Sequence, residues 1–305
     1  MTVGVDGVKS VVAAAILMVL TCAVEARIVT YSAGIENSQW YQAASIFECS
    51  LTHTVPNFGK AVFYHEAGEK LKFYLETVQS PMGNGEAALV VEAPDWAPGR
   101  QVKDLGMVKV TQTARPVTVG ERLSTNMMAG LMDGMMPTIT GTTWYASDGV
   151  RIRVNPVNFS QFYNDYQSCV ATLLPVNFRQ VERTIIQFEV DKAELTKQDK
   201  VLLDKVVLYV KADKTVSAIF VDGHTDSSGR RIANRRLSRD RAEVVTAYLV
   251  KKGLPPEQVT TRYHGERYPV VDNKTKASRV KNRRATVRLQ RGEQAEQEED
   301  ATPME

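Results

Sequence analysis

The stretch Val221-Asp222-Gly223-His224-Thr225-Asp226 decides the fold of the C-terminal third of this chain. It begins inside Ile219-Phe220-Val221, a β-branched and aromatic run of the kind that forms buried strands. After it, apolar residues recur at helical spacing; they are Leu237, Val244, Val245, Tyr248 and Leu249. The pattern predicts a strand that ends near Gly223, a loop, and a helix that packs back on the sheet.

An arginine within the apolar stripe of this helix predicts a polar pocket. At about 100° per residue, Arg241 falls in the middle of the stripe, and Asn234 lies close to the same line. A guanidinium on a core-facing line is costly unless an anion meets it, and Asp226 is the nearest candidate within the chain. We therefore predict that Asp226, Asn234 and Arg241 line one pocket, which holds both charge signs and suits a zwitterion.

The same residues resemble the OmpA-like C-terminal domain family. The resemblance covers roughly residues 184–291 and rests on Gly223-His224-Thr225-Asp226, Asn234, Leu237-Ser238, Arg241-Ala242 and Asn282-Arg283-Arg284. It implies non-covalent binding of peptidoglycan. In this family the Asp and the Arg grip the diaminopimelate of the stem peptide, which assigns these roles to Asp226 and Arg241, with Asn234 assisting.

Three further residues join the expected peptidoglycan-binding set through the resemblance. Asp191 stands where the family places a small polar residue, often Asn, beside the pocket, and its extra negative charge is expected to tune affinity. Arg283 and Arg284 belong to the last motif of the family.

Length and composition bound the remaining possibilities. A chain of 305 residues exceeds the usual size of one core, so two domains are expected. Its net charge of +3 is too small to imply a nucleic-acid binder by itself. Basic residues do gather between Arg230 and Arg241. Arg235 and Arg239 are explained by a helix face exposed to solvent. If the protein bound nucleic acid, by contrast, the whole cluster would contact backbone phosphates.

Residues 1–26 read as a cleavable secretory signal. Lys9 supplies a weak positive region, the apolar run at 11–20 is too short for a comfortable membrane span, and cleavage is expected after Ala26. Lipidation at Cys22 is not favoured, because Thr21 is a poor residue before a lipidated cysteine. We expect an exported, periplasmic protein without a membrane span.

Loss of Cys22 with the signal leaves Cys49 and Cys169. Two thiols in an oxidising compartment predict one disulfide; two buried free thiols are the alternative. So long a closed loop would contribute about 4–5 kcal/mol in the loop-entropy model.

Residues 27–180 are predicted to form an antiparallel β-rich domain with small helical additions. The expected hairpin joins strands at 61–65 and 71–75, and further strands are expected at 87–91, 107–110, 117–119, 143–145 and 150–154. Short helices are expected at 39–48 and 158–166. His53 and His65 are isolated and are interpreted as structural. A methionine-rich stretch at 127–136 is interpreted as a packed corner of the core in preference to a partner surface.

Residues 181–291 show the order β-α-β-α-β-β. Strands are expected at 185–188, 216–221, 259–264 and 284–290, and helices from residue 191 and at 234–251, the second ended by Gly253. This order predicts an α/β sandwich and makes the whole chain an α+β two-domain protein. The acidic residues 292–305 are expected to be disordered.

Nearly the whole chain after the signal segment resembles a family of periplasmic proteins of the sodium-type flagellar motor. The resemblance rests on the domain order, on Cys49 and Cys169, and on Tyr31-Ser32-Ala33-Gly34-Ile35 and Phe47-Glu48-Cys49-Ser50-Leu51. It implies a non-enzymatic component of the T ring, without a cofactor. The N-terminal domain would dock on the basal body and the protein MotX, and the C-terminal domain would anchor stators to peptidoglycan.

Three other functions compete with this hypothesis. The first is an OmpA-like envelope anchor unrelated to motility. The second is an exported binder of nucleic acid or another polyanion. The third, an enzyme with His224 and Asp226 as acid and base, is disfavoured because neither a nucleophile nor a metal set accompanies them.

Overall fold

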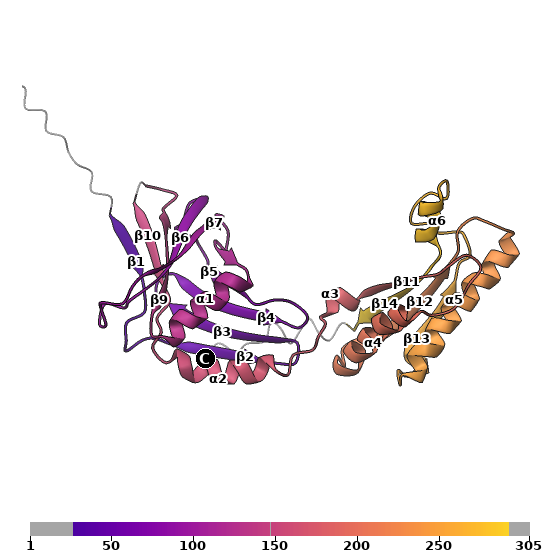
Figure 1. Cartoon of the computed structure of the whole chain (residues 1–305), viewed down its shortest axis with the longest axis horizontal. Coiled ribbons are helices and arrows are strands. Elements are labelled where there is room, and N and C mark those ends of the chain that lie inside the picture. Colours follow the sequence, from indigo (N-terminus) through magenta and orange to yellow (C-terminus); the bar gives the residue numbers. More distant parts are fainter. Residues whose placement is uncertain (1–26, 147, 293–305) are drawn as a thin grey trace, which may run out of the picture.

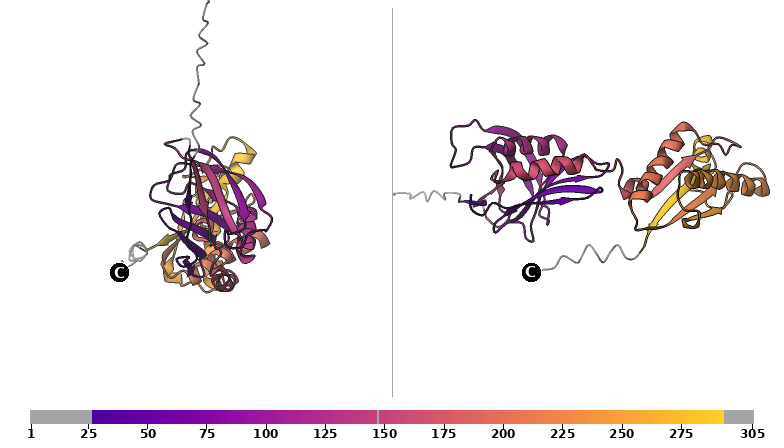
Figure 2. Two further views of the ribbon diagram at one scale, coloured as in Figure 1. Left: turned by 90° about the vertical axis from the view of Figure 1, so that its left-hand side faces the viewer. Right: turned by 90° about the horizontal axis from the view of Figure 1, so that it is seen from below.

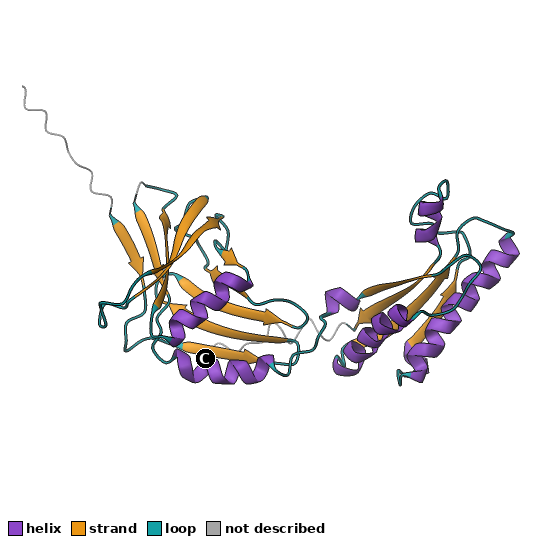
Figure 3. Ribbon diagram, in the orientation of Figure 1, coloured by secondary structure: helices purple, strands orange, loops and turns teal. Residues whose placement is uncertain are grey.

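The computed structural model describes residues 27–146 and 148–292. The predicted signal segment and all of the acidic tail after Gly292 lie outside the described residues. Figures 1 and 3 show two lobes, one rich in strands and one in which helices accompany a sheet. Their hydrophobic cores are separate: the first extends to Cys169, and the second begins at Val176, a few residues before the predicted domain boundary. No helix in the described part of the chain is long and apolar enough to cross a membrane.

The N-terminal lobe contains two five-stranded sheets and two longer helices. The first sheet has the order β1-β10-β9-β6-β7, with bounds Ile28–Tyr31, Gly149–Arg153, Met136–Thr142, Gly85–Glu92 and Lys103–Val110. The second has the order β2-β3-β4-β5-β8, with bounds Trp40–Ala44, Glu48–Val55, Gly59–Glu66, Lys72–Glu76 and Thr118–Val119. Helix α1 (Glu121–Met132) packs on β5 and β9, and α2 (Phe159–Val170) packs on β2 and β3. The predicted β-rich architecture is confirmed, with one parallel pair, β1 and β10.

Two local predictions in this lobe are wrong. Residues 39–48 contain strand β2 in place of the expected helix, because Trp40 packs on the ring of Phe159 (4.8 Å between centroids) and donates its indole N–H to the Asn155 carbonyl. Residues 143–145 lie beyond β9 and leave Trp144 exposed. The methionine-rich stretch spans α1 and the start of β9, and four of its five methionines are buried; they are Met127, Met128, Met135 and Met136. The core interpretation of this stretch is therefore confirmed.

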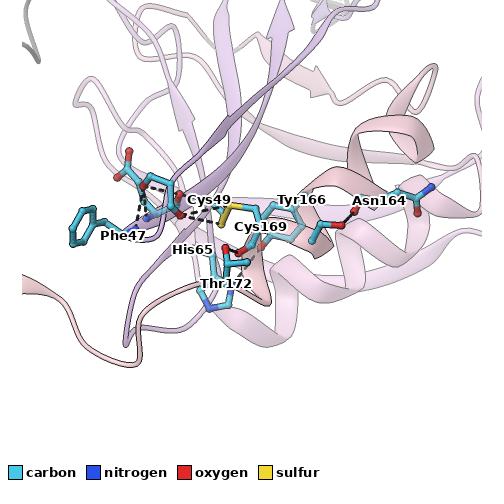
Figure 4. The surroundings of a disulfide bond; sticks show 10 residues. Phe47, Cys49, His65, Asn164, Tyr166, Cys169 and Thr172 are labelled. Atoms are coloured by element: carbon cyan, nitrogen blue, oxygen red, sulfur yellow. Dashed lines mark hydrogen bonds between the residues drawn. A yellow bond between two sulfur atoms is a disulfide. The ribbon is translucent and has the colours of Figure 1, made fainter. Parts of the chain in front are cut away.

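The predicted disulfide joins Cys49 on β3 to Cys169 near the end of α2, with the Cα atoms 6.0 Å apart. The alternative of two free thiols is wrong. Figure 4 shows the bridge beside Tyr166, with Thr172 donating its hydroxyl to the Cys169 carbonyl. The bridge thus ties the C-terminal end of α2 to the start of β3 in the second sheet.

His53 is fully buried on β3, and its ring lies 4.8 Å from that of Trp40. Burial lowers the pKa of His53 from 6.5 to about 4. As the pH falls below about 6.5, His53 binds a proton in the unfolded chain but not yet in the folded protein. The free energy of unfolding that neutral His53 contributes above pH 6.5 is therefore lost as the pH falls toward 4. The pKa shift corresponds to about 3 kcal/mol in the free energy of unfolding of the N-terminal lobe.

A histidine replacement tests this pH dependence. We expect His53→Leu to reduce by about 2–3 kcal/mol the difference in unfolding free energy between pH 7 and pH 4.5. Tryptophan fluorescence is a selective probe, because Trp40, Trp96 and Trp144 all belong to the N-terminal lobe. His65→Gln, on the neighbouring strand β4, is the matched control. An unchanged pH dependence in His53→Leu would contradict the assignment.

The C-terminal lobe is a four-stranded sheet in the order β11-β14-β12-β13. The bounds are Arg183–Gln187, Arg284–Arg291, Val216–His224 and Val259–Tyr263. Strand β12 pairs antiparallel with β14 and parallel with β13. Helices α4 (Lys197–Ala212) and α5 (Arg231–Lys251) pack on one face of this sheet (Figure 1). The predicted β-α-β-α-β-β order is confirmed, with a short additional helix α6 (Lys276–Asn282) before β14.

The first helix of this lobe starts later than predicted. Asp191 has a φ of 55°, a left-handed conformation, so a right-handed helix cannot begin at this residue. Helix α4 begins instead at Lys197, where Thr196 and Asp199 form a capping box. The loop between β11 and α4 is therefore free to contribute backbone groups to the site below.

Helix α3 (Phe178–Val181) and its neighbours connect the two lobes (Figure 2). Arg179 forms an ion pair with Glu66 at the end of β4. The rings of Phe47 and Tyr209, one from each lobe, lie 5.7 Å apart.

Candidate functional site

The motif glycine sets the distance between β12 and α5. A Cβ atom on Gly223 would lie 1.9 Å from the backbone oxygen of Ser238 and 3.1 Å from the Ala242 side chain. The Ser238 hydroxyl also accepts the backbone N–H of Gly265, at 2.9 Å. These motif residues are packing residues that bring α5 against the strand. The close packing carries Arg241, on the same helix, to the end of β12.

Arg241 is fully buried at the centre of the candidate site. Its guanidinium donates to three backbone carbonyls, those of Lys192 (2.9 Å), His224 (3.0 Å) and Glu189 (3.0 Å). It also lies over the ring of Phe188, 5.2 Å from the centroid. Arg241 therefore binds together the β11–α4 loop and the end of β12.

The guanidinium of Arg241 keeps its charge and part of its hydrogen-bonding capacity. Burial, together with the nearby charge of Arg283, lowers its pKa to about 10, against the opposing effect of Asp226 and Asp191. The group therefore stays protonated at neutral pH. Since Nε and each Nη use one N–H on a carbonyl, one N–H remains on each Nη. This pair of donors suits a carboxylate.

Asp226 does not form the predicted direct pair with Arg241. Its Oδ2 accepts a hydrogen bond from Arg283 Nη1 at 2.9 Å, and its Oδ1 accepts the backbone N–H of Ser228 at 2.9 Å. The expectation that Asp226 is the anion meeting Arg241 is thus corrected, because Arg283 is the closer cation. Burial raises the pKa of Asp226, but the hydrogen bonds from Arg283 and Ser228 outweigh this and hold it below its usual value.

The other residues predicted for the site are Asn234, Asp191 and Arg284, and they lie at different distances from Asp226 and Arg241. Asn234 is buried in the first turns of α5 and donates to Glu266 Oε2 at 2.5 Å. Asp191 is exposed on the β11–α4 loop, and its charge acts on Arg241. Arg284 pairs in register with His224 on the sheet face away from α4 and α5. The structure therefore brings together Asp226, Arg241 and Arg283, with Asp191 beside them, and separates Arg284 from them.

Two contributors were not predicted as site residues. Glu266 follows β13 and holds the Asn234 side chain. Asn282 is fully buried, and its side chain accepts the backbone N–H of Val270 at 2.9 Å and donates to the Val271 carbonyl at 2.8 Å. The motif asparagine thus organises the loop before Arg283, a role that its position in the motif did not reveal.

His264, which directly follows β13, lies against Asp222 and His224. Its Nε2 lies 2.8 Å from Asp222 Oδ1, and its ring stacks on that of His224 with 5.0 Å between centroids. Burial and the charge of Arg284 lower the pKa of His224 to about 4, so it is neutral at pH 7. Among the described residues, no group of three His, Cys, Asp or Glu side chains is placed to hold a metal ion.

Comparison with known proteins supports both halves of this description. The family model of the OmpA family matches residues 187–283, so the C-terminal lobe is an OmpA-like domain. The model of the MotY N-terminal domain matches residues 31–175. The chain is 30% identical over 265 residues to the sodium-type flagellar protein MotY of Vibrio parahaemolyticus, which covers 86% of this chain and 90% of that protein. The chain belongs to the MotY family of flagellar proteins.

Two further similarities cover about a third of this chain. Outer membrane protein A of Bordetella avium is 38% identical over 102 residues, which are 33% of this chain and 52% of that protein. This chain thus matches about half the length of that relative. The peptidoglycan-associated lipoprotein of Burkholderia pseudomallei is 29% identical in a superposition that covers 35% of this chain and 89% of that one, with a TM-score of 0.34.

Proposed function

We propose that this protein is a non-enzymatic periplasmic component of the T ring of the sodium-driven flagellar motor. Its N-terminal domain docks on the basal body and MotX, and its C-terminal domain anchors stators to peptidoglycan. Membership of the MotY family supports the motor assignment. The observation that carries the anchoring role is the buried, charged Arg241, with two free N–H groups, close to the carboxylate of Asp226.

The cluster is suited to the zwitterionic end of diaminopimelate. In our proposal, Arg241 binds the carboxylate through the N–H groups that the backbone leaves free, and Asp226 binds the ammonium. One carboxylate oxygen of Asp226 accepts a hydrogen bond from Arg283 and the other accepts one from Ser228. Each oxygen therefore retains one lone pair that can accept from the ammonium. Arg283 therefore stays in place and adds positive charge near the bound carboxylate.

Anchoring to the wall fits the mechanics of a motor. A stator must resist the reaction to the torque it generates, and the cell wall is the rigid body within reach. Single clamps of this kind bind modestly, but several copies arranged in a ring multiply the holding strength through avidity. The protein acts in this proposal as a tether without turnover.

Deletion of the protein tests the motor assignment against the other anchors. We expect the deletion strain to lose swimming while it still assembles filaments, because filament assembly does not need the stator. A fluorescent fusion should lie at the flagellar base, and a pull-down should recover basal-body proteins. A fusion spread around the envelope, with outer-membrane lipoproteins in the pull-down, would favour the envelope anchor unrelated to motility. Strong salt-dependent binding of DNA would favour the polyanion binder.

A further inference from the structure

Four arginines gather on the face of the C-terminal sheet opposite to α4 and α5. The register places Arg183 beside Arg288, Arg284 beside His224, and Arg262 beside Asp222. All six residues line one cavity of about 380 Å³, together with His264, Tyr268 and Thr286. We call this surface the arginine face.

The positive charge of the arginine face exceeds its negative charge. Asp222 is fully engaged by Arg262, which donates two hydrogen bonds of 2.7 Å, and by His264. Within the described part of the chain, the other three arginines, Arg183, Arg284 and Arg288, form no ion pair with a carboxylate. Like charges held this close repel one another, and a bound anion would relieve the repulsion.

Two buried side chains that line this cavity have polar atoms without a partner. Arg284 is 4% exposed, and its Nε has no hydrogen-bond partner among the described residues. The same holds for Nδ1 of His224, which is 6% exposed. Because buried polar groups in folded proteins nearly always have partners, these two atoms mark a polar position beside the cavity that the described residues leave unsatisfied.

Three of the four guanidinium groups, those of Arg262, Arg284 and Arg288, are held in place before any ligand arrives. Arg262 and Arg288 both lie over the ring of Phe220, each 4.7 Å from its centroid. Arg284 is fixed by a hydrogen bond from Nη2 to the Tyr268 carbonyl at 3.1 Å. A site with fixed donors loses little side-chain entropy when it binds a ligand.

We propose that the arginine face binds an oxyanion of the phosphate class, either free phosphate or the phosphate of a lipid headgroup. Three unpaired guanidinium groups match a dianion better than the single charge of a carboxylate, and guanidinium geometry suits phosphate oxygens. This site goes beyond the wall-binding proposal and does not rest on it. Arg241 contacts His224 through the backbone carbonyl alone, whereas the side chain of His224 lines the arginine face.

Calorimetric titration of the mature full-length protein with inorganic phosphate, at constant ionic strength, tests the proposal. We expect saturable binding by the wild type and at least a tenfold loss of affinity in the double variant Arg183→Gln/Arg288→Gln, since charge-assisted hydrogen bonds are lost. Both side chains are exposed, so the fold should tolerate the change. Arg236→Gln, on the exposed surface of α5, is the matched control and should bind as the wild type does.

Vesicles distinguish the two sources of phosphate. Sedimentation with phosphatidylcholine vesicles that contain phosphatidic acid, and not with phosphatidylcholine alone, would identify a lipid headgroup; binding of inorganic phosphate alone would identify the free anion. Peptidoglycan sedimentation should be the same in the double variant and the wild type. The proposal is overturned if the wild type binds neither probe, if acetate binds as tightly as phosphate, or if the double variant binds like Arg236→Gln.

Discussion

The Arg241→Ala variant is expected to lose binding to purified peptidoglycan by a factor of about 30 or more. Loss of one partner from a buried charged contact costs about 2–5 kcal/mol, and each 1.4 kcal/mol is tenfold in affinity. The stability of the C-terminal lobe should fall as well. The His224 carbonyl loses a buried donor, and an unsatisfied buried group costs about 1–3 kcal/mol; the Lys192 and Glu189 carbonyls each lose a partly buried hydrogen bond.

Because Arg241→Ala combines a binding defect with a stability defect, Asp226→Asn is the variant that isolates recognition. The amide keeps one oxygen, which can accept the Ser228 N–H, and Arg283 keeps its hydrogen bond to the Phe188 carbonyl, but the change removes the charge that attracts the ammonium. We expect this variant to stay folded by circular dichroism and to lose wall binding at least tenfold. Arg241→Lys should not restore binding, since an ammonium cannot reproduce the planar set of donors.

Peptidoglycan sedimentation of the three variants measures the effect, with Arg236→Ala as a control on an exposed position of the same helix. Full retention of wall binding by a folded Asp226→Asn protein would remove the proposed clamp. The same conclusion follows if Arg236→Ala loses as much binding as Arg241→Ala, because the effect would then come from the overall charge of α5.

The sequence predicted the position of Arg241 but not its partners. Helical periodicity placed it on the core-facing line, and the structure confirms that it is buried. Its partners are backbone carbonyls, and a carbonyl carries no signature of residue type by which a sequence could reveal it. The pairing of Asp226 with Arg283 was missed for another reason. It depends on a loop organised by Asn282, which is distant from Asp226 in the chain.

The separation of Arg283 from Arg284 was predictable in principle. Successive residues of an extended backbone point to opposite faces, so two adjacent arginines at the start of a strand cannot both face one pocket. Arg283 turns to Asp226, and Arg284 lines the arginine face. The family motif contains both residues, and for that reason the resemblance alone assigned them to one site.

The prediction of the fold was most accurate where a periodic pattern of apolar residues extends over many positions. It was least accurate where contacts with distant residues determine the secondary structure. The order of strands and helices in the C-terminal lobe followed from runs of apolar residues. By contrast, residues 39–48 have no strong periodic pattern, and the burial of Trp40 against α2 selects a strand there. This packing depends on Phe159, more than a hundred residues away, and local propensity cannot anticipate it.

Removal of the disulfide has the second large expected effect, on the stability of the N-terminal lobe. We expect Cys49→Ala/Cys169→Ala to lower its free energy of unfolding by about 4 kcal/mol, because the bridge closes a loop with a sequence separation of 120 residues. Alanine is the suitable replacement since both cysteines are buried, and a serine hydroxyl would need a partner there. A loss of this size is a large fraction of the 5–15 kcal/mol typical of a folded domain.

The position of the bridge indicates which parts should loosen first. Cys169 is the next-to-last residue of α2, after which the chain leaves toward the second core, and the Leu174 N–H donates to the Ile46 carbonyl at 2.9 Å. Without the bridge, the point at which the lobes join is held by such hydrogen bonds, by the packing of α2, and by the contacts of Arg179 with Glu66 and of Phe47 with Tyr209. We therefore expect α2 and the β2–β3 turn to exchange amide hydrogens faster in the double variant than in the wild type.

Denaturant unfolding followed by tryptophan fluorescence measures this stability, because all three tryptophans lie in the N-terminal lobe. Wild-type protein treated with a reductant should match the double alanine variant, while Ser168→Ala, an exposed position next to Cys169, should match untreated wild type. The C-terminal lobe has no cysteine, so peptidoglycan binding by the double variant should persist in the absence of denaturant. A fall of less than about 1 kcal/mol would show that the bridge adds little to a lobe that packing already holds together.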